Sequence, residues 1–367
     1  MVLSRRIETI QKKLSEKEGS AFVIISPFNR RYLTDIKTSS GYIIITPENG
    51  FFFTDSRYIE FAKKSLGAYY TVEPYPKTPE AKKYYTELLQ KENIKNILYE
   101  ENSIYLKTKK HFDDIFSEFA LLESGNLVEK MREVKDESEI ENIKKAQNIT
   151  DTAFSYILNV ISQNANTITE SDIAAELEYF MKKNGAEAAA FDIIAVSGKK
   201  SSYPHGQPEN IKLSKGFLTM DFGALYNGYC SDMTRTVCLG RPTDKMQEVY
   251  GTVKSAQCAA LEMIKADIAA VEVDRAVRGI IKSAGYGDNF GHGAGHSLGL
   301  EIHESPGFPK SEEEQKEEII LSENMVMTME PGIYLEGEFG VRIEDLVVVK
   351  QGGCLNLTKS EKELIVI

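Results

Sequence analysis

The chain has 367 residues, about twice the usual length of one domain, and this length predicts two domains. Hydrophobic residues make up 42% and charged residues 27%, a balance typical of globular proteins with a buried core, so intrinsic disorder is excluded. The formal net charge of −11 disfavours a nucleic-acid partner, because polyanions bind basic surfaces. The apolar runs fall far short of the roughly 20 residues of a membrane helix, so we expect no membrane span.

The N-terminal segment and the cysteines indicate the compartment. Residues 3–14 carry apolar side chains at helical spacing with basic residues between them, which predicts a surface helix and not a secretory signal. The cysteines are sparse and show no CxxC spacing, which argues against a disulfide framework; they are Cys230, Cys238, Cys258 and Cys354. We therefore expect a cytoplasmic protein.

The first half of the chain is predicted to be a mixed α/β domain covering residues 1–126. Strand-like apolar runs alternate with turn signals at residues 21–27, 42–45 and 51–58. The sequence PENG at residues 47–50 is a natural reversal between the last two runs. A lysine-rich stretch with a helical pattern follows between residues 77 and 110.

The second half, residues 127–367, is predicted to be an α+β domain. Two capping boxes predict helix starts: Asp136 with Glu139, and Thr169 with Asp172. Two further helices are expected at residues 246–264 and 273–283, with strands between and after them. The acidic tract at residues 311–318 predicts a solvated loop.

A hairpin in the second half brings two aspartates together. Asn227-Gly228 predicts a two-residue type I′ turn, since both of its central positions need positive φ. In that register Asp221 pairs with Thr234, and Asp232 lies on the same face of the sheet. Two acids so close repel each other unless a cation lies between them. The alternative is a pair of solvent-facing aspartates on an edge hairpin.

Four of the five histidines lie in two short segments, YPHG and GHGAGHSLGLEIHE: His205, His292, His296 and His303. Neutral imidazole is the commonest protein metal ligand and the usual proton carrier near pH 7. Each histidine alone would be explained as a structural residue, but their concentration favours a site.

Two glutamates complete the candidate set. In NMVMTMEPG, strand alternation places Glu330 on one face with Thr328, and in GVRIEDLVVV it places Arg342, Glu344 and Leu346 on one face. A glutamate in an otherwise apolar strand needs a partner, because an isolated buried charge is costly. A salt bridge at Glu344 or a turn cap at Glu330 are the alternatives.

Together these residues suit two divalent cations. The candidate ligands are Asp221, Asp232, His296, Glu330 and Glu344. Their four negative charges neutralise two such ions, and an oxygen-rich set with one imidazole suits Mn²⁺, Co²⁺, Fe²⁺ or Zn²⁺. The set lacks thiolates, which argues against a structural zinc site, and predicts a paired-metal hydrolase.

The motifs resemble the metal-dependent Xaa-Pro peptidases, aminopeptidase P and prolidase, which share a pita-bread catalytic fold with methionine aminopeptidase and creatinase. The matching stretches are FDIIAVSGKKSSYPHG, MDFGALYNGYCSDMTRT, FGHGAGHSLGLEIHESP, TMEPGIY and GVRIEDLVVV. SPFNRRYLTDIKTSSGYIIIT and FFFTDSRY are similar to the creatinase-type N-terminal domain. The resemblance implies a creatinase-like α/β domain followed by an α+β pita-bread domain, the same five metal ligands, manganese as the expected metal, and a homodimer.

The resemblance also implies hydrolysis of the peptide bond preceding proline, in dipeptides or longer peptides. A hydroxide bridging the two metals would attack the carbonyl carbon, with Glu330 taking its proton. His205 and His303 would lie around the scissile bond, and His292 would line the proline pocket. Arg342 would pair either with a carboxylate of the substrate or with a neighbouring acid of the protein.

Two other functions are considered: a peptide-binding or scaffold protein without catalysis, and a creatinase-like hydrolase without metals. The complete ligand set argues against both, because four crowded acids need cations. The sequence does not decide between a dipeptidase and an aminopeptidase. The chain departs from many relatives at Ala266-Asp267, where they carry glycine, and there we expect a changed helix end with unchanged chemistry.

Overall fold

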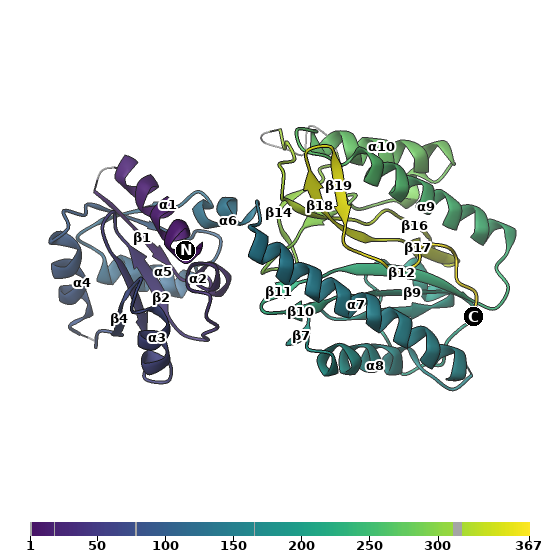
Figure 1. The fold of residues 1–367 in the computed structure, drawn as a ribbon, viewed down its shortest axis with the longest axis horizontal. Helices are drawn as coiled ribbons and strands as arrows, with labels where there is room; N and C mark the ends of the chain where they lie inside the picture. Colours follow the sequence, from purple (N-terminus) through teal and green to yellow (C-terminus); the bar gives the residue numbers. More distant parts are fainter. Residues whose placement is uncertain (1, 18, 78, 165, 311–317) are drawn as a thin grey trace. The chain divides into compact units, whose positions relative to one another are not determined.

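The computed structural model describes residues 2–17, 19–77, 79–164, 166–310 and 318–367. It separates into two compact units, residues 1–132 and 133–367, and each is described by itself (Figure 1). The acidic tract predicted to be a solvated loop lies almost wholly outside the described residues. Across the described residues, every helix is too short or too polar to cross a bilayer.

The first unit is a six-stranded sheet with helices around it. The strands are β1 Ser20–Ile24, β2 Tyr42–Ile45, β3 Gly50–Thr54, β4 Thr71–Pro74, β5 Asn96–Tyr99 and β6 Ala120–Glu123. They lie in the order β4-β3-β2-β1-β5-β6, with β2 antiparallel to both β1 and β3. The helices are α1 Val2–Glu16, α2 Pro27–Thr34, α3 Ile59–Leu66, α4 Ala81–Gln90, α5 Leu106–Ile115 and α6 Leu127–Arg132.

Strand alternation explains how both faces of this sheet are covered. Ala21 and Val23 of β1 belong to the same buried cluster as residues of α4 and α5. Since successive side chains point to opposite faces, Phe22 and Ile24 are left for the other face, where α1 contacts β1 and β2. The predicted mixed α/β organisation of the first half is confirmed.

Helix α6 packs within the first unit. Val128 is buried, the Tyr32 hydroxyl donates to the Met131 carbonyl at 3.2 Å, and Arg132 Nη1 donates to Asn29 Oδ1 at 2.7 Å. The contacts therefore divide the chain six residues after the predicted border at 126/127. Where independently folding domains begin and end stays a prediction.

The helices of the second unit follow the predicted caps. They are α7 Glu137–Asn164, α8 Glu170–Lys183, α9 Asp244–Met263 and α10 Ala270–Ser283, with short 3₁₀ turns at Gly198–Ser202 and Gly287–Asn289. Asp136 and Glu139 exchange side-chain to backbone hydrogen bonds at 3.0 and 3.1 Å at the start of α7. Thr169 and Asp172 form the second capping box, at the start of α8. Both predicted helix starts are confirmed.

The strands of the second unit form several small sheets. They are β7 Ala188–Ala189, β8 Ile194–Ser197, β9 Gly216–Phe222, β10 Ala224–Tyr226, β11 Tyr229–Cys230, β12 Met233–Leu239, β13 His296–Ser297, β14 Glu304–Gly307, β15 Val326–Met329, β16 Gly332–Leu335, β17 Phe339–Arg342, β18 Asp345–Lys350 and β19 Gly353–Asn356. The larger sheets have the orders β12-β9-β8 and β14-β13-β15-β18-β19.

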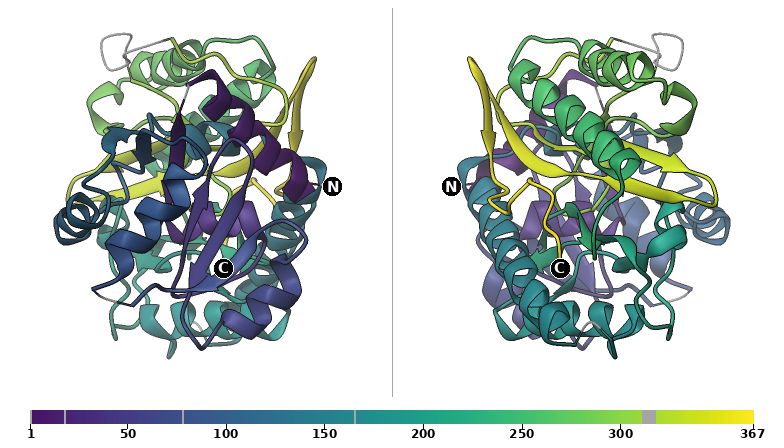
Figure 2. Two further views of the ribbon diagram at one scale, coloured as in Figure 1. Left: turned by 90° about the vertical axis from the view of Figure 1, so that its left-hand side faces the viewer. Right: turned by 90° about the vertical axis from the view of Figure 1, so that its right-hand side faces the viewer.

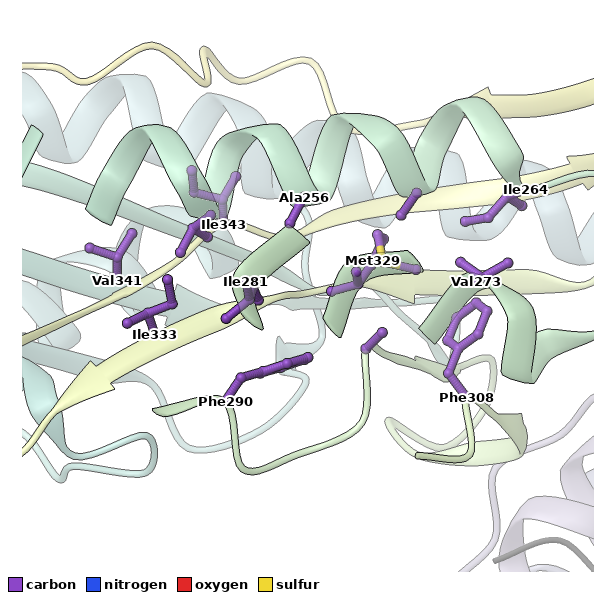
Figure 3. Close-up of a cluster of buried hydrophobic side chains, with 14 of the residues drawn as sticks. Ala256, Ile264, Val273, Ile281, Phe290, Phe308, Met329, Ile333, Val341 and Ile343 are labelled. Carbon is purple, nitrogen blue, oxygen red and sulfur yellow. The ribbon is translucent and has the colours of Figure 1, made fainter. Parts of the chain in front are cut away.

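Two pairs of helices cover these sheets from opposite sides (Figure 2). Helices α7 and α8 share a buried cluster with one face of β8, β9 and β12. Helices α9 and α10 share another cluster with β15 to β18, part of which Figure 3 shows. Neighbours in β9 belong to different clusters, Phe217 to the α9 side and Leu218 to the α7 side, as strand alternation requires.

The predicted hairpin has the predicted register. Asn227 and Gly228 have φ of 47° and 81°, and Asp221 pairs with Thr234 between β9 and β12. Gly223 separates β9 from β10. A Cβ atom there would meet the Ser231 carbonyl oxygen at 1.8 Å, so only glycine allows this close approach.

One predicted strand is wrong. The run from Gly340 to Val349 was expected to be a single strand, but it breaks at Ile343 and Glu344. β17 pairs with β16, whereas β18 pairs with β15 and β19, so the chain changes partner at the break. Arg342 and Glu344 still line one cavity, but Leu346 does not line it.

The cysteines and the segment after α9 were also the subject of predictions from the sequence. All four cysteines are free. Beyond α9, Asp267 takes a φ of 66°, which glycine adopts without steric cost, and it does not line the cavity described below.

Replacing Thr169 with alanine is expected to lower the free energy of unfolding by about 1 kcal/mol, because the first turn of α8 loses its cap. Urea unfolding followed by circular dichroism measures the change. Ser155→Ala is the control, because its hydroxyl lies exposed in the middle of α7. Equal stability of the two variants would contradict the role of the cap.

Candidate metal centre

One cavity of about 360 Å³ gathers every residue predicted to act in the site. Those residues are His205, Asp221, Asp232, His292, His296, His303, Glu330, Arg342 and Glu344. Apolar side chains complete its wall: Phe191, Ile194, Pro204 and Ile302. Segments more than 100 residues apart in the chain therefore meet at one place.

The five candidate ligands lie at or next to the ends of strands. Asp221 is the second-last residue of β9, and Asp232 directly precedes β12. His296 begins β13, Glu330 directly follows β15, and Glu344 lies in the break between β17 and β18. These strand ends lie far apart in the sequence, and they bring the five side chains to one cavity.

The His296 ring is arranged as a ligand. Its Nδ1 donates to the Ser297 carbonyl at 3.1 Å, which leaves the lone pair of Nε2 free. That nitrogen lies 3.7 Å from Asp232 Oδ2 and 3.6 Å from Glu330 Oε1. These distances are too long for hydrogen bonds. A lone pair facing two ionised carboxylates is repulsive unless a cation or a proton lies between them.

Ligand atoms of Asp232, His296 and Glu344 all lie within 4.8 Å of one another. Among the described residues, three buried oxygens of the cluster have no hydrogen-bond partner: Asp221 Oδ1, Asp232 Oδ1 and Glu344 Oε1. Unpartnered buried oxygens are costly, and divalent cations satisfy such oxygens. The residues therefore fit a divalent metal site.

The buried acids resist ionisation in the absence of cations. Burial, with the surrounding carboxylates adding to it, raises the pKa of Asp232 and Glu344 well above the ordinary range. Burial also raises the pKa of Glu330 to about 8, although the Arg342 guanidinium opposes this. Burial lowers the pKa of His296 to about 4, so its imidazole is neutral and able to bind metal.

Thr234 and Tyr334 are functional-site residues that the sequence reasoning missed. The Thr234 hydroxyl donates to Glu344 Oε2 at 2.7 Å and accepts from Arg342 Nε at 2.9 Å. The Tyr334 hydroxyl accepts from Arg342 Nη1 at 2.8 Å. Both residues had a signal in the sequence. Thr234 is the cross-strand partner of Asp221, and Tyr334 is the last residue of the TMEPGIY motif.

The contacts of Arg342 favour the structural alternative for this residue. Its side chain is buried, and Nη2 donates to Asp221 Oδ2 at 2.6 Å. Other donors reach Thr234, Tyr334 and the Pro204 carbonyl. Pairing with a substrate carboxylate stays a prediction.

The remaining histidines lie at different depths. His292 donates from Nδ1 to the Gly293 carbonyl at 2.9 Å and accepts from the Tyr334 hydroxyl at 3.0 Å, and burial lowers its pKa to about 4. The ring of His303 meets that of His296 edge-on, with centroids 4.5 Å apart. His205 is exposed at the mouth of the cavity. Their catalytic roles stay predictions.

A cavity of acids around a neutral imidazole, at the strand ends of small sheets covered by two pairs of helices, is typical of a divalent-metal hydrolase of the pita-bread fold. Residues 141–351 match metallopeptidase family M24, and residues 6–134 match the creatinase/prolidase N-terminal domain. The chain belongs to this family of metal-dependent peptidases, and the resemblance drawn from its motifs is confirmed.

Individual relatives agree with this assignment over the whole length. The uncharacterized peptidase YqhT of Bacillus subtilis is 36% identical over 363 residues, covering 99% of this chain and all of the relative. An Xaa-Pro dipeptidase structure from Bacillus anthracis aligns with a TM-score of 0.92 and 35% identity, covering 100% of both chains. An X-Pro aminopeptidase structure from Thermotoga maritima aligns with a TM-score of 0.86 and 36% identity, covering 98% and 99%.

The metal-free protein is expected to lose stability as the pH rises from about 7.3 to 8. In this window unfolded carboxyls are deprotonated and unfolded histidines nearly so, while the folded chain still holds a proton on Glu330, whose pKa is about 8. The folded state therefore binds more protons, and the free energy of unfolding falls with pH. Divalent metal replaces these protons and should reverse the trend.

Unfolding of the chelated protein at pH 7.3, 7.6 and 8.0, with and without Mn²⁺, measures this dependence. Glu330→Gln should give a shallower slope without metal, and Glu336→Gln, at an exposed position, should leave the slope unchanged. An identical slope in the Glu330→Gln variant would show that this carboxyl does not hold the proton.

Proposed function

We propose that this metallopeptidase hydrolyses the peptide bond preceding proline, using two divalent ions held by the five candidate ligands. The observation that carries the proposal is the neutral His296 ring, whose Nε2 lone pair faces Asp232 and Glu330 at 3.7 and 3.6 Å. The comparisons support the substrate class, because similar structures are named Xaa-Pro dipeptidase and X-Pro aminopeptidase.

When bound, the ions supply Lewis acidity and lower the pKa of a water molecule toward neutrality. We assign to Glu330 the acceptance of a proton from the attacking water, because its carboxyl lines the cavity beside His296 and would be ionised once metal is bound. We assign to His205 and His303 hydrogen bonds to the developing oxyanion and to the leaving nitrogen, since both line the cavity.

Proline sets special demands that the cavity is suited to meet. Its nitrogen carries no N–H in the peptide, and its ring fixes φ, so an extended binding mode gives poor recognition. The apolar wall of Phe191, Ile194 and Ile302 offers a surface for the ring, and His292 lies on the same cavity. Manganese as the metal, a homodimer and a cytoplasmic location remain predictions.

The Asp232→Asn variant is expected to lose peptidase activity by at least a thousandfold while staying folded, because the amide removes one charge from the metal site. Hydrolysis of Ala-Pro and metal content by mass spectrometry measure the two effects. Asp114→Asn, at an exposed site of the first unit, is the control. Activity near the control value would refute the metal role of Asp232.

Substrate length distinguishes the two possible activities. After reconstitution with Mn²⁺, hydrolysis of Ala-Pro and of Ala-Pro-Ala is compared, with Ala-Ala as the peptide lacking proline. Cleavage of both proline peptides indicates an aminopeptidase, and cleavage of Ala-Pro alone indicates a dipeptidase. Rapid cleavage of Ala-Ala with neither proline peptide cut would overturn the proposed substrate class.

A further inference from the structure

A buried lysine lies beside the two segments that carry His296 and His303. Lys135 follows the first unit by three residues, and its side chain is 1% exposed. Its ammonium donates to the Glu133 carbonyl at 3.3 Å, to Ser297 Oγ at 3.0 Å and to Glu304 Oε2 at 3.3 Å. An ammonium has three N–H donors, and these three acceptors match that number.

Two of these acceptors adjoin the site histidines directly. Ser297 follows His296, and Glu304 follows His303. The ammonium therefore connects the two histidine segments from behind the cavity, whose walls include both imidazoles but not Lys135. The two rings that depend on these segments lie in edge-on contact, 4.5 Å between centroids.

The carboxylate of Glu304 also shapes its own loop. Its Oε1 accepts a hydrogen bond from the Glu301 backbone N–H at 3.1 Å. A Cβ atom on Gly299 would lie 2.8 Å from both carboxylate oxygens, so the chain passes against the carboxylate with no room for a side chain. The loop that ends at His303 is thus folded around a fixed acid.

An ion pair this deeply buried is a poor source of net stability. Moving both charges out of water costs several kcal/mol per ion. Well-packed apolar side chains in place of a buried ion pair often give a protein of equal or greater stability. What the pair gives here is fixed geometry, because each partner is held by further hydrogen bonds. Catalysis is sensitive to displacements of about 1 Å, so a geometric role is the one that matters at this place.

We propose that Lys135 is a positioning residue of the peptidase site: through Ser297 and Glu304 it sets the mutual placement of the His296 and His303 imidazoles. The consequence for turnover rests on the proposed function above. The consequence for the two rings does not, because it follows from the hydrogen bonds alone.

Kinetics test the first consequence. Lys135→Met is expected to lower kcat about ten- to a hundredfold with KM within about threefold of the parent, because the site is displaced while ground-state binding is kept. Lys145→Met, on the exposed side of α7, is the matched control. The double variant Lys135→Met/Glu304→Gln removes both charges of the buried pair, so it should be more stable than Lys135→Met and keep the loss of kcat. A double variant with parental kcat would overturn the proposal.

Nuclear magnetic resonance of histidine side chains tests the second consequence without any substrate. The chain has five histidines, and His111 on α5 serves as an internal reference. In the zinc-loaded protein, Lys135→Met and Gly299→Ala should both shift the His296 and His303 signals and leave the His111 signal in place. The methyl group added by Gly299→Ala would displace the Glu304 carboxylate, while the charges of Lys135 and Glu304 are both kept. Unchanged His296 and His303 signals in both variants would overturn the proposal, whatever the peptidase activity.

Discussion

Mutual repulsion among buried carboxylates is the constraint on which the site depends. Asp221, Asp232, Glu330 and Glu344 line one cavity, and burial raises the pKa of the last three far enough to favour the protonated form. The repulsion in such a cluster is relieved either by protons on the carboxylates or by cations bound between them. The neutral imidazole of His296, with its lone pair turned toward the acids, is suited to bind a cation when one replaces the protons.

The fold meets this constraint by combining both of its helix-covered layers. β9 and β12, which carry or adjoin the two aspartates, pack under α7 and α8 on one face. β15 and the chain between β17 and β18, which place the two glutamates, pack with α9 and α10. Thr234 and Arg342 link the two sets, since each contacts an acid or its neighbour across the cavity. The site is complete only when both layers are in place.

The sequence predicted those parts of the structure that local chemistry determines. The Asn227-Gly228 turn and strand alternation were enough to pair Asp221 with Thr234, and the capping boxes placed the starts of α7 and α8. The break at Glu344 was not predictable, because the apolar pattern runs through it and only the exchange of pairing partners interrupts the strand. The contacts of Lys135 span 162 and 169 residues, and no local pattern reports on pairings of that separation.

The crowding of acids also bears on how proteins of this architecture diverge. Each buried carboxyl of the candidate set destabilises the metal-free protein, so replacing one with a neutral side chain should raise the stability of that form. A protein of this architecture that needed no metal would gain stability by losing these acids. The presence of the whole set in this chain agrees with its membership of a family of metal-dependent peptidases.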